Sequence, residues 1–387
     1  MDREQATRYM QDLLRAMVQR GGSDLFVTAG FPPAIKVDGE MTQLTDRPLG
    51  ADQSALLVRA IMNDKQAKAF DATKEANFAI NPRGIGRFRV SAFVQQGRTG
   101  AVLRTIKTEI PRLEDLQLPE ILEEIAMTKR GLVIVVGATG SGKSTTLAGM
   151  LGKRNQKSRG HIITIEDPVE FVHPHQGCVI TQREVGVDTE DWYAALKNTL
   201  RQAPDVILIG EIRDRETMDY AVQFAETGHL CLSTLHANNA NQALDRIINL
   251  FPEERREQLL MDLALNLKAI ISQRLVRNSD GEGMSVAVEI LINTPLIADM
   301  IQKGEVGEIK EVMGRSRELG MQTFDQALFE LFEAGRIGYE DAIRNADSAN
   351  ELRLKIKLES DRQPRDLEKG TEKLHIMEDD DPSGHRR

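Results

Sequence analysis

The sequence is poor in cysteine, in aromatic residues and in long apolar runs. Its 387 residues contain only two cysteines, Cys178 and Cys231, so the chain alone can form neither a disulfide framework nor a four-cysteine zinc site. This scarcity favours a reducing compartment, the cytoplasm. Aromatic residues make up 4% of the chain, which argues against large stacking surfaces for single-stranded nucleic acid.

No segment approaches the run of about 20 apolar residues that a membrane-spanning helix requires. The stretch Met1–Arg20 carries charges throughout instead of the apolar centre of a signal peptide. We therefore expect no transmembrane segment, and contact with a membrane only through partners. The formal net charge of -9 argues against a protein that coats DNA or an anionic membrane through its overall field.

The length of the chain fits two compact domains and an appendage. Residues 1–112 combine an amphipathic helix from Ala6 to Val18, a hairpin turn at Asp38-Gly39, a helical stretch over Ala55–Phe70 and a β-rich run near its end, which predicts a small α+β domain. Two prolines in Pro111–Lys129 indicate a linker, which we place at 113–130.

From Gly131 onward, continuous apolar strands alternate with helices, a pattern typical of a parallel sheet covered on both faces. It predicts an α/β domain over 131–346, with a long helix over Glu253–Leu275. The four clearest strands are Leu132–Val136, His161–Ile165, Val206–Ile209 and Leu230–Thr234.

Residues 347–387 are expected to form a charged, partly disordered tail, because charge dominates and apolar residues are few. Ser348–Glu351 fits a capping box at the start of a helix. The apolar residues of Leu352–Leu358 alternate with polar ones as in a strand. The sequence leaves both interpretations open.

The segment Gly137–Ser144 reads Gly-Ala-Thr-Gly-Ser-Gly-Lys-Ser and matches the phosphate-binding loop, with the required apolar strand before it and a helix after it. In such a loop, glycines let backbone amides face phosphate oxygens, Lys143 reaches the β- and γ-phosphates, and Ser144 offers its hydroxyl to Mg²⁺. In this context a chance glycine-rich turn is the weaker alternative, so ATP and Mg²⁺ are the expected cofactors. The expected nucleotide-binding residues are Gly137, Ala138, Thr139, Gly140, Ser141, Gly142, Lys143, Ser144 and Thr145.

A second predicted strand, within Asp205–Glu211, ends in an acid. Gly210 stands where many such enzymes keep a magnesium-binding aspartate. Glu211 is therefore the candidate that binds the metal together with Ser144, or that organises the attacking water. A buried strand with a solvated acid at its end is the alternative.

Another apolar strand is followed by three carboxylates within five positions, Glu166, Asp167 and Glu170. Hydrolysis of ATP needs a base or an orienting acceptor for water, so one of these acids is a candidate. Acids that only face solvent from a turn are the alternative, and spacing alone does not separate Glu166 from Glu170.

His229 and His236 flank one strand, near the place of a γ-phosphate sensor, although a lone histidine at a strand end is more often structural. Their separation argues against a shared metal ion. Arg87, Arg89 and Arg104 lie on the β-rich part of the first domain. If that domain folds over the nucleotide, some of them become arginine fingers, in their own chain or for a neighbour; exposed strand positions are an equal alternative.

Together these segments resemble the secretion ATPase superfamily, and within it the type IV pilus retraction ATPases of the PilT and PilU kind. The resemblance runs from near Gly22 to about Leu358 and implies a PAS-like first domain, a RecA-like second domain and a ring of six subunits. The segments shared with the family in the same order are Ser23-Asp24-Leu25, Arg87–Val90, Gly137–Ser144, Ile165–Phe171, Gln182–Val185, Gly210–Asp214 and the block from His229 to His236.

The resemblance assigns the water-activating role to Glu170 and the second-strand acid to Glu211, and it matches His229 and His236 to the family's histidine box. Pilus assembly and type II secretion ATPases carry a tetracysteine zinc module that this chain cannot form, which favours the retraction branch. Retraction motors usually carry an Ala-Ile-Arg motif, whereas Pro295–Met300 here lacks the arginine. Because of that departure and the charged tail, the chain resembles PilU, the accessory retraction paralogue.

The leading hypothesis is a cytoplasmic ring ATPase, peripheral at the inner membrane, that hydrolyses ATP to drive or assist pilus retraction and twitching motility. Its expected partners are copies of itself in a hexamer, a sister retraction ATPase and an inner-membrane pilus platform protein. One alternative is a weakly hydrolysing adaptor stacked on a sister motor. Another is a DNA translocase, against which the acidic charge and the few aromatic residues weigh.

Overall fold

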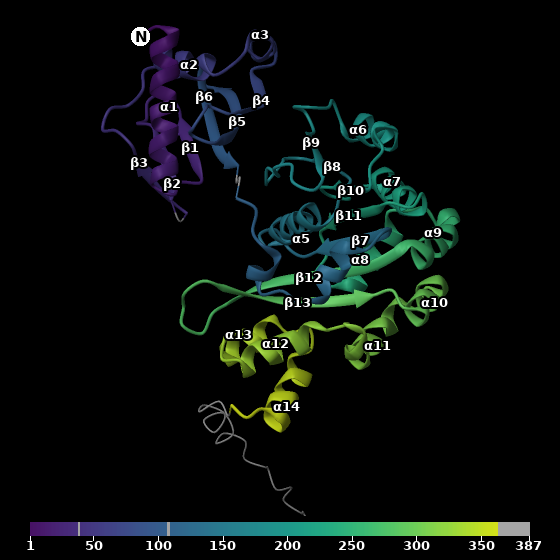
Figure 1. The fold of residues 1–387 in the computed structure, drawn as a ribbon. Coiled ribbons are helices and arrows are strands. Elements are labelled where there is room, and N and C mark those ends of the chain that lie inside the picture. Colours follow the sequence, from purple (N-terminus) through teal and green to yellow (C-terminus); the bar gives the residue numbers. More distant parts are fainter. Residues whose placement is uncertain (38, 107–108, 363–387) are drawn as a thin grey trace, which may run out of the picture.

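A six-stranded antiparallel sheet organises the first part of the chain in the computed structural model, which describes residues 1–37, 39–106 and 109–362 (Figure 1). Its strand order is β3-β2-β1-β6-β5-β4. The strands are β1 (Asp24–Val27), β2 (Ala34–Val37), β3 (Glu40–Gln43), β4 (Glu75–Ile80), β5 (Arg87–Gln95) and β6 (Arg98–Ile106). The predicted hairpin joins β2 and β3, which pair antiparallel, although Asp38 itself lies outside the described residues.

Three helices accompany this sheet: α1 (Arg3–Gln19), α2 (Ala51–Ala60) and α3 (Asp64–Thr73). The apolar face predicted for the first helix is buried, with Met10, Leu14 and Met17 fully inaccessible to solvent. The helical stretch predicted over Ala55–Phe70 is present, but as two helices, α2 and α3, with Ile61–Asn63 between them. The second helix begins after Asn63, because the Asn63 side chain accepts a hydrogen bond from the backbone N–H of Gln66 and so caps the start of α3.

A seven-stranded sheet forms the second part, in the order β13-β12-β7-β11-β10-β8-β9. Neighbouring strands are parallel except for β12 and β13, which pair antiparallel at one edge. The strands are β7 (Gly131–Val136), β8 (His161–Glu166), β9 (Val179–Glu184), β10 (Val206–Ile209), β11 (Leu230–Leu235), β12 (Leu267–Arg277) and β13 (Met284–Ile292). The four strands predicted most clearly are all present.

Successive residues of β7 point to opposite faces of this sheet, and both faces are covered. Leu132, Ile134 and Val136 join a core with four helices that follow α5 (Lys143–Lys157) and with two later helices, whereas Val133 and Val135 pack with α5. The four helices are α6 (Trp192–Thr199), α7 (Arg215–Glu226), α8 (Ala240–Asn249) and α9 (Glu253–Asn266). This layered arrangement is visible in Figure 1.

The long helix predicted over Glu253–Leu275 is wrong. Helix α9 ends at Asn266, and the chain continues as β12 beside β7. Most of β12 is buried, so its apolar residues do not show the alternation of a half-exposed strand. Periodicity alone does not distinguish such a buried strand from a buried helix.

The residues expected to form a linker fold as a short 3₁₀ turn, η1 (Leu113–Leu116), and a helix, α4 (Ile121–Met127). Both pack against α5, where Leu113 and Leu122 share a core with Leu147 and Leu151. The buried ammonium group of Lys153 on α5 also forms ion pairs with Glu114 and, at 2.7 Å, with Glu123. This segment is therefore part of the packed structure.

The chain then forms a group of helices below the sheet: α10 (Pro295–Lys303), η3 (Val306–Glu308), α11 (Ile309–Arg315), η4 (Arg317–Leu319), α12 (Phe324–Glu333), α13 (Tyr339–Asn345) and α14 (Ala349–Glu359). The segment left open between helix and strand is helix α14, with Leu352 and Ile356 buried one turn apart. The rest of the expected tail, residues 363–387, lies outside the described residues. In the part of the chain that is described, no helix is both long and apolar enough to cross a bilayer.

A buried carboxylate ties these helices to the sheet. Asp347 accepts a hydrogen bond at 2.5 Å from Arg274 of β12 and also pairs with Lys310. Only 10% of the Asp347 side chain is exposed. The Arg274 guanidinium also lies 3.9 Å from the centre of the Phe324 ring. Arg274 therefore joins the strand to both α12 and the residues after α13.

We predict that Asp347→Ala destabilises the fold by about 3 kcal/mol, because it leaves two partly buried cations without their carboxylate. The loss is measured from urea unfolding curves of the full chain. Asp299→Ala is the matched control, since Asp299 pairs with Lys303 where both side chains are half exposed. It is expected to cost much less, because water screens the attraction in an exposed ion pair. Equal losses in the two variants would contradict the prediction.

Candidate nucleotide-binding site

The loop between β7 and α5 requires glycine at its first position. Gly137 has φ 150°, and a Cβ there would lie 2.6 Å from the Gln273 carbonyl oxygen of β12 and would also meet the Ser141 hydroxyl. Gly142, the residue before α5, has φ 92°, in the left-handed region that favours glycine. The loop thus turns closely against the sheet and delivers the chain to the amino end of α5, where helix amides are free to bind an anion.

Lys143 is held at the mouth of this loop. Its ammonium group donates to the carbonyl oxygens of Gly137 at 2.8 Å and Ala138 at 2.9 Å. Burial lowers the pKa of Lys143, and the negative charge of Glu211 acts in the opposite direction. The side chain is thus fixed by the loop that carries it, and Glu211, which follows β10, is close enough to affect its ionisation.

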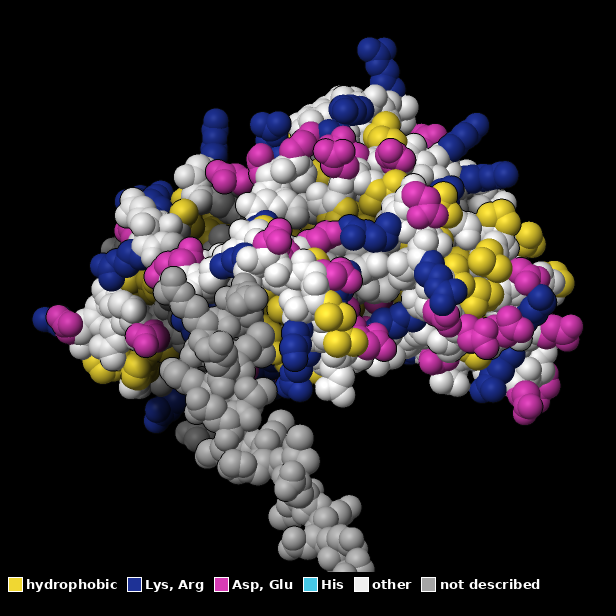
Figure 2. Space-filling model, turned by 90° about the horizontal axis from the view of Figure 1, so that it is seen from below, with side chains coloured by type: hydrophobic (Ala, Val, Ile, Leu, Met, Phe, Trp, Pro, Cys, Tyr) yellow, Lys and Arg dark blue, Asp and Glu magenta, His cyan; other side chains and the backbone are white. Residues whose placement is uncertain are grey.

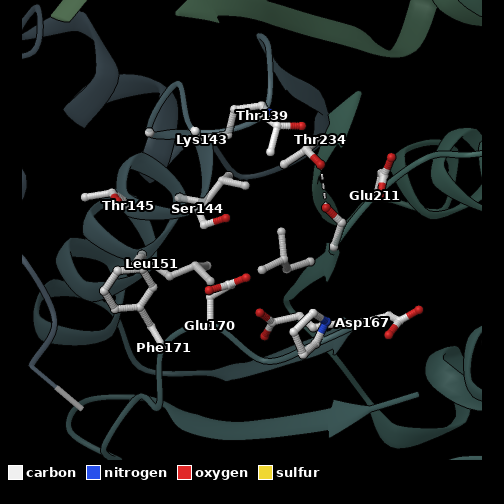
Figure 3. A pocket seen from close by; sticks show the side chains of 18 of the residues that line it. Thr139, Lys143, Ser144, Thr145, Leu151, Asp167, Glu170, Phe171, Glu211 and Thr234 are labelled. Atoms are coloured by element: carbon white, nitrogen blue, oxygen red, sulfur yellow. Dashed lines mark hydrogen bonds between the residues drawn. The ribbon is translucent and has the colours of Figure 1, made fainter. Parts of the chain in front are cut away.

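A cavity of about 430 Å³ joins the loop to the predicted acids (Figure 3). It lies at the carboxyl ends of the parallel strands, where ligands of open α/β sheets bind. Of the residues predicted for the site, the structure brings Thr139, Gly140, Gly142, Lys143, Ser144, Thr145, Glu166, Glu170, Glu211 and His236 to its wall. Ser141 is buried behind the loop.

Glu211 follows β10 and is fixed by two neighbours. Its carboxylate accepts a hydrogen bond from Arg213 at 2.8 Å, and it lies 3.2 Å from Nε2 of His236. The preceding Gly210 packs against β8, and a Cβ at this position would lie 3.2 Å from the Glu166 Cα. The close packing of the two strands accounts for glycine where many such enzymes have an aspartate.

The two glutamates that spacing could not separate have different environments. Glu166 is buried and accepts hydrogen bonds from Thr164 at 2.6 Å and Gln182 at 3.3 Å. Burial raises the pKa of Glu166 to about 7. Glu170 is exposed and is directed into the cavity in Figure 3. The exposed carboxylate is the one with open access to a ligand.

The three candidate arginines lie in different places. Arg89 of β5 approaches the acidic segment, 3.7 Å from Asp167 and 4.0 Å from Glu184. Arg87 does not line the cavity, although its charge acts on the pKa of Glu184. Arg104 pairs at 2.7 Å with Asp24 inside the first sheet. The structure therefore places Arg89 nearest to the site and gives Arg104 a partner elsewhere.

His229 does not reach the cavity of its own chain. It precedes β11, and its Nδ1 lies 3.1 Å from both the Phe224 carbonyl oxygen and the Thr227 hydroxyl. His236 follows the opposite end of the same strand and contacts Glu211. The two histidines are thus separated by the length of β11, as their spacing predicts, and only His236 belongs to this site.

Sequence reasoning missed several residues of the cavity wall, among them Phe171, His173 and Trp192. His173 is buried, its Nδ1 has no hydrogen-bond partner among the described residues, and burial lowers its pKa to about 4. It is therefore neutral near pH 7. Its closeness in sequence to the acidic cluster was the available signal, but a histidine that follows two apolar residues matches no motif.

Comparison with known proteins identifies the family of the chain. Residues 1–323 match the family described as Type II/IV secretion system protein. The chain is 61% identical over 377 residues to the type IV pilus ATPase PilU of Pseudomonas aeruginosa, which covers 97% of this chain and 99% of the relative. It is 42% identical over 335 residues to the retraction ATPase PilT of the same organism, covering 87% and 97%.

The crystal structure of the pilus retraction motor PilT with bound ADP has the same fold, with a TM-score of 0.83 and 39% sequence identity. The match covers 89% of this chain and 98% of that one. It confirms the predicted fold class, an α/β protein with a RecA-like core. Because the family match and both relatives span most of the sequence, the chain belongs to the type II/IV secretion system protein family, and within it to the PilT/PilU-type pilus ATPases.

Proposed function

We propose that this chain hydrolyses ATP with Mg²⁺ in the cavity beside Lys143 and uses the reaction to drive or assist retraction of a type IV pilus. The observation behind this proposal is that one cavity joins the phosphate-binding loop to three glutamates, Glu166, Glu170 and Glu211. The relatives named PilU and PilT support the link to pili.

The phosphate end of the nucleotide binds the loop amides and the Lys143 ammonium group. Ser144 and Glu211 would hold Mg²⁺, which neutralises charge on the phosphates when bound. Both residues line the cavity, and no cluster of three metal-binding side chains occurs within the described ranges. This set fits Mg²⁺, since that ion usually takes one or two protein ligands and completes its shell with phosphate oxygens and water.

Glu170 is the acceptor that orients or deprotonates the attacking water, because its carboxylate is exposed in the cavity. Glu166 is less suited to this role, since it is buried and its pKa is raised to about 7. His236 holds Glu211 from the neighbouring strand. Among the three candidate arginines of the first domain, Arg89 is the one that contacts the wall of the cavity, because it forms an ion pair with Asp167.

Six copies in a ring around a central opening, with the first domain moving as a rigid body over a neighbouring core, would convert this reaction into force. The proposed location is the cytoplasmic side of the inner membrane, on a pilus platform protein. A DNA translocase is disfavoured. On the face shown in Figure 2, basic and acidic side chains are interspersed among the described residues, whereas DNA binding favours a basic patch or stripe.

An adaptor that acts beside a sister motor is the second candidate. The observation that favours it is helix α10, which begins with Pro295-Leu296-Ile297 and has no arginine before Lys303. Leu296 is 54% exposed there, and Asp299 is paired with Lys303. This helix therefore exposes an apolar side chain, Leu296, and its lysine, Lys303, is paired with Asp299.

The first prediction concerns turnover. Lys143→Ala and Glu211→Ala should each lower kcat for ATP by about 100-fold or more. The first substitution removes a positive charge that stabilises the transferring phosphoryl group, and the second removes the carboxylate proposed to hold Mg²⁺. Steady-state release of phosphate from the full chain measures this. Lys157→Ala, an exposed lysine near the other end of the same helix, is the matched control and should retain normal turnover. Normal turnover in both site variants would reject the assignment.

The second prediction concerns pH. In the folded chain burial raises the pKa of Glu166 to about 7, whereas an exposed glutamate side chain ionises near 4.5. The folded state binds the extra proton in this window, so its contribution to stability is present below pH 4.5 and is lost as the pH rises through 7. Glutamine at position 166 cannot ionise. The free energy of unfolding of Glu166→Gln should therefore rise relative to that of the original chain as the pH increases from 4.5 to 7, by about 3 kcal/mol in total. Urea unfolding at a series of pH values measures the difference, and parallel curves would refute it.

The third prediction separates motor from adaptor. If the chain assists a sister retraction ATPase, deleting the sister gene should abolish pilus retraction although this chain is still produced. Retraction is followed by imaging labelled pili in living cells, and immunoblotting verifies the amount of this protein. Full retraction without the sister gene would show an autonomous motor.

A further inference from the structure

Gln182 of β9 joins the two ends of the acidic segment that follows β8. Its Nε2 donates to the Glu166 carboxylate at 3.3 Å and to the Phe171 carbonyl oxygen at 2.9 Å. Its Oε1 accepts the backbone N–H of His173 at 2.7 Å. Both donors and the acceptor of the amide are therefore used by one segment, Glu166–His173, which includes Glu170.

The middle of this segment is held from the same strand. Two residues after Gln182, the buried carboxylate of Glu184 accepts the backbone N–H of Val169 at 3.1 Å. Side chains two positions apart on a strand point to the same side, so Gln182 and Glu184 act on the segment together. Strands β8 and β9 are parallel, with Glu166 opposite Glu184. The register of the sheet thus places both anchors.

Glu170 lies between residues whose main-chain groups are fixed by these contacts, Val169 and Phe171. Its own carboxylate is directed into the cavity and is exposed there (Figure 3). A side chain with open surroundings depends on its backbone for its position. The contacts of Gln182 and Glu184 therefore set where this carboxylate lies relative to the phosphate-binding loop.

We propose that Gln182 is a positioning residue for ATP hydrolysis, whose amide holds the Glu166–His173 segment so that Glu170 faces the phosphate end of the nucleotide. This inference rests on the proposed function. Gln182 acts through Glu170 and does not line the cavity. Its removal should therefore slow the chemical step and leave nucleotide binding by the loop and Lys143 unaffected.

The test compares steady-state kinetics of the full chain with Gln182→Met and Gln182→Glu. Methionine keeps the length and volume but removes all three hydrogen bonds. Glutamate keeps an acceptor for the His173 N–H but cannot donate to Glu166 or Phe171. Each variant should lower kcat by about 30- to 100-fold, because a displacement of about 1 Å at a reacting group costs on the order of 100-fold. KM for ATP should change by less than about 3-fold.

Thr181→Val is the matched control. Thr181 is adjacent on the same strand, and its hydroxyl lies 2.8 Å from Nε2 of His161. The substitution removes one hydrogen bond without touching the acidic segment, so kcat and KM should stay within about 2-fold of the original values. A general weakening of β9 would instead lower activity in this variant as well, and that result would overturn the positioning role.

Turnover of Gln182→Met within about 2-fold of the original chain would also overturn the inference, as would a rise in KM with kcat unchanged. If Gln182→Met does not fold, the same criteria apply to Gln182→Glu. An original chain that hydrolyses no ATP, measured beside Lys143→Ala, would reject the proposed function itself. Normal hydrolysis in the original chain and in the Gln182 variants would reject only the role of Gln182.

Discussion

The close packing of Gly137 against strand β12 is the constraint on which the candidate site depends. The Gln273 carbonyl oxygen occupies the space that any side chain at Gly137 would need. From the same residue, the Gln273 amide donates to the Thr146 hydroxyl in the first turns of α5 at 2.8 Å. One residue of β12 therefore determines both where the phosphate-binding loop leaves the sheet and where the following helix begins. Lys143 and Ser144 take their positions from these two contacts.

Local sequence patterns predicted the strands around the cavity, but they did not predict the elements whose form depends on packing against distant residues. The strands around the nucleotide cavity are short, apolar and bounded by loops, and all four were predicted. Strand β12 was predicted as part of a helix, because a strand buried on both faces has no alternation to reveal it. The role of Gln273 was thereby hidden, although Gly137 itself was evident from the motif. Segment α14 is a helix because Leu352 and Ile356, one helical turn apart, are buried on the same side. The core that they join is formed by residues distant in sequence and could not be predicted from the segment alone.

The same limit applies to the acids. Spacing placed Glu166 and Glu170 together but could not rank them, because burial is a property of the folded chain. Glu166 lies against Thr164 and Gln182, which are 2 and 16 residues away, and it is largely removed from water. Glu170 is exposed four residues later. The arginines show a similar division: Asp24, the partner of Arg104, is distant in sequence, and only the pairing of β1 with β6 brings the two residues together.

Helix α5 connects two places that are usually discussed separately. Its 15 residues correspond to about 22 Å. Its amino end borders the cavity. On its later turns, Lys153 forms ion pairs with two carboxylates of the segment that leads from the first sheet to the second. One unbroken helix therefore connects the wall of the cavity with the segment between the two sheets. The first sheet and the cavity are in this way joined through α5, although no described residue of that sheet lines the cavity.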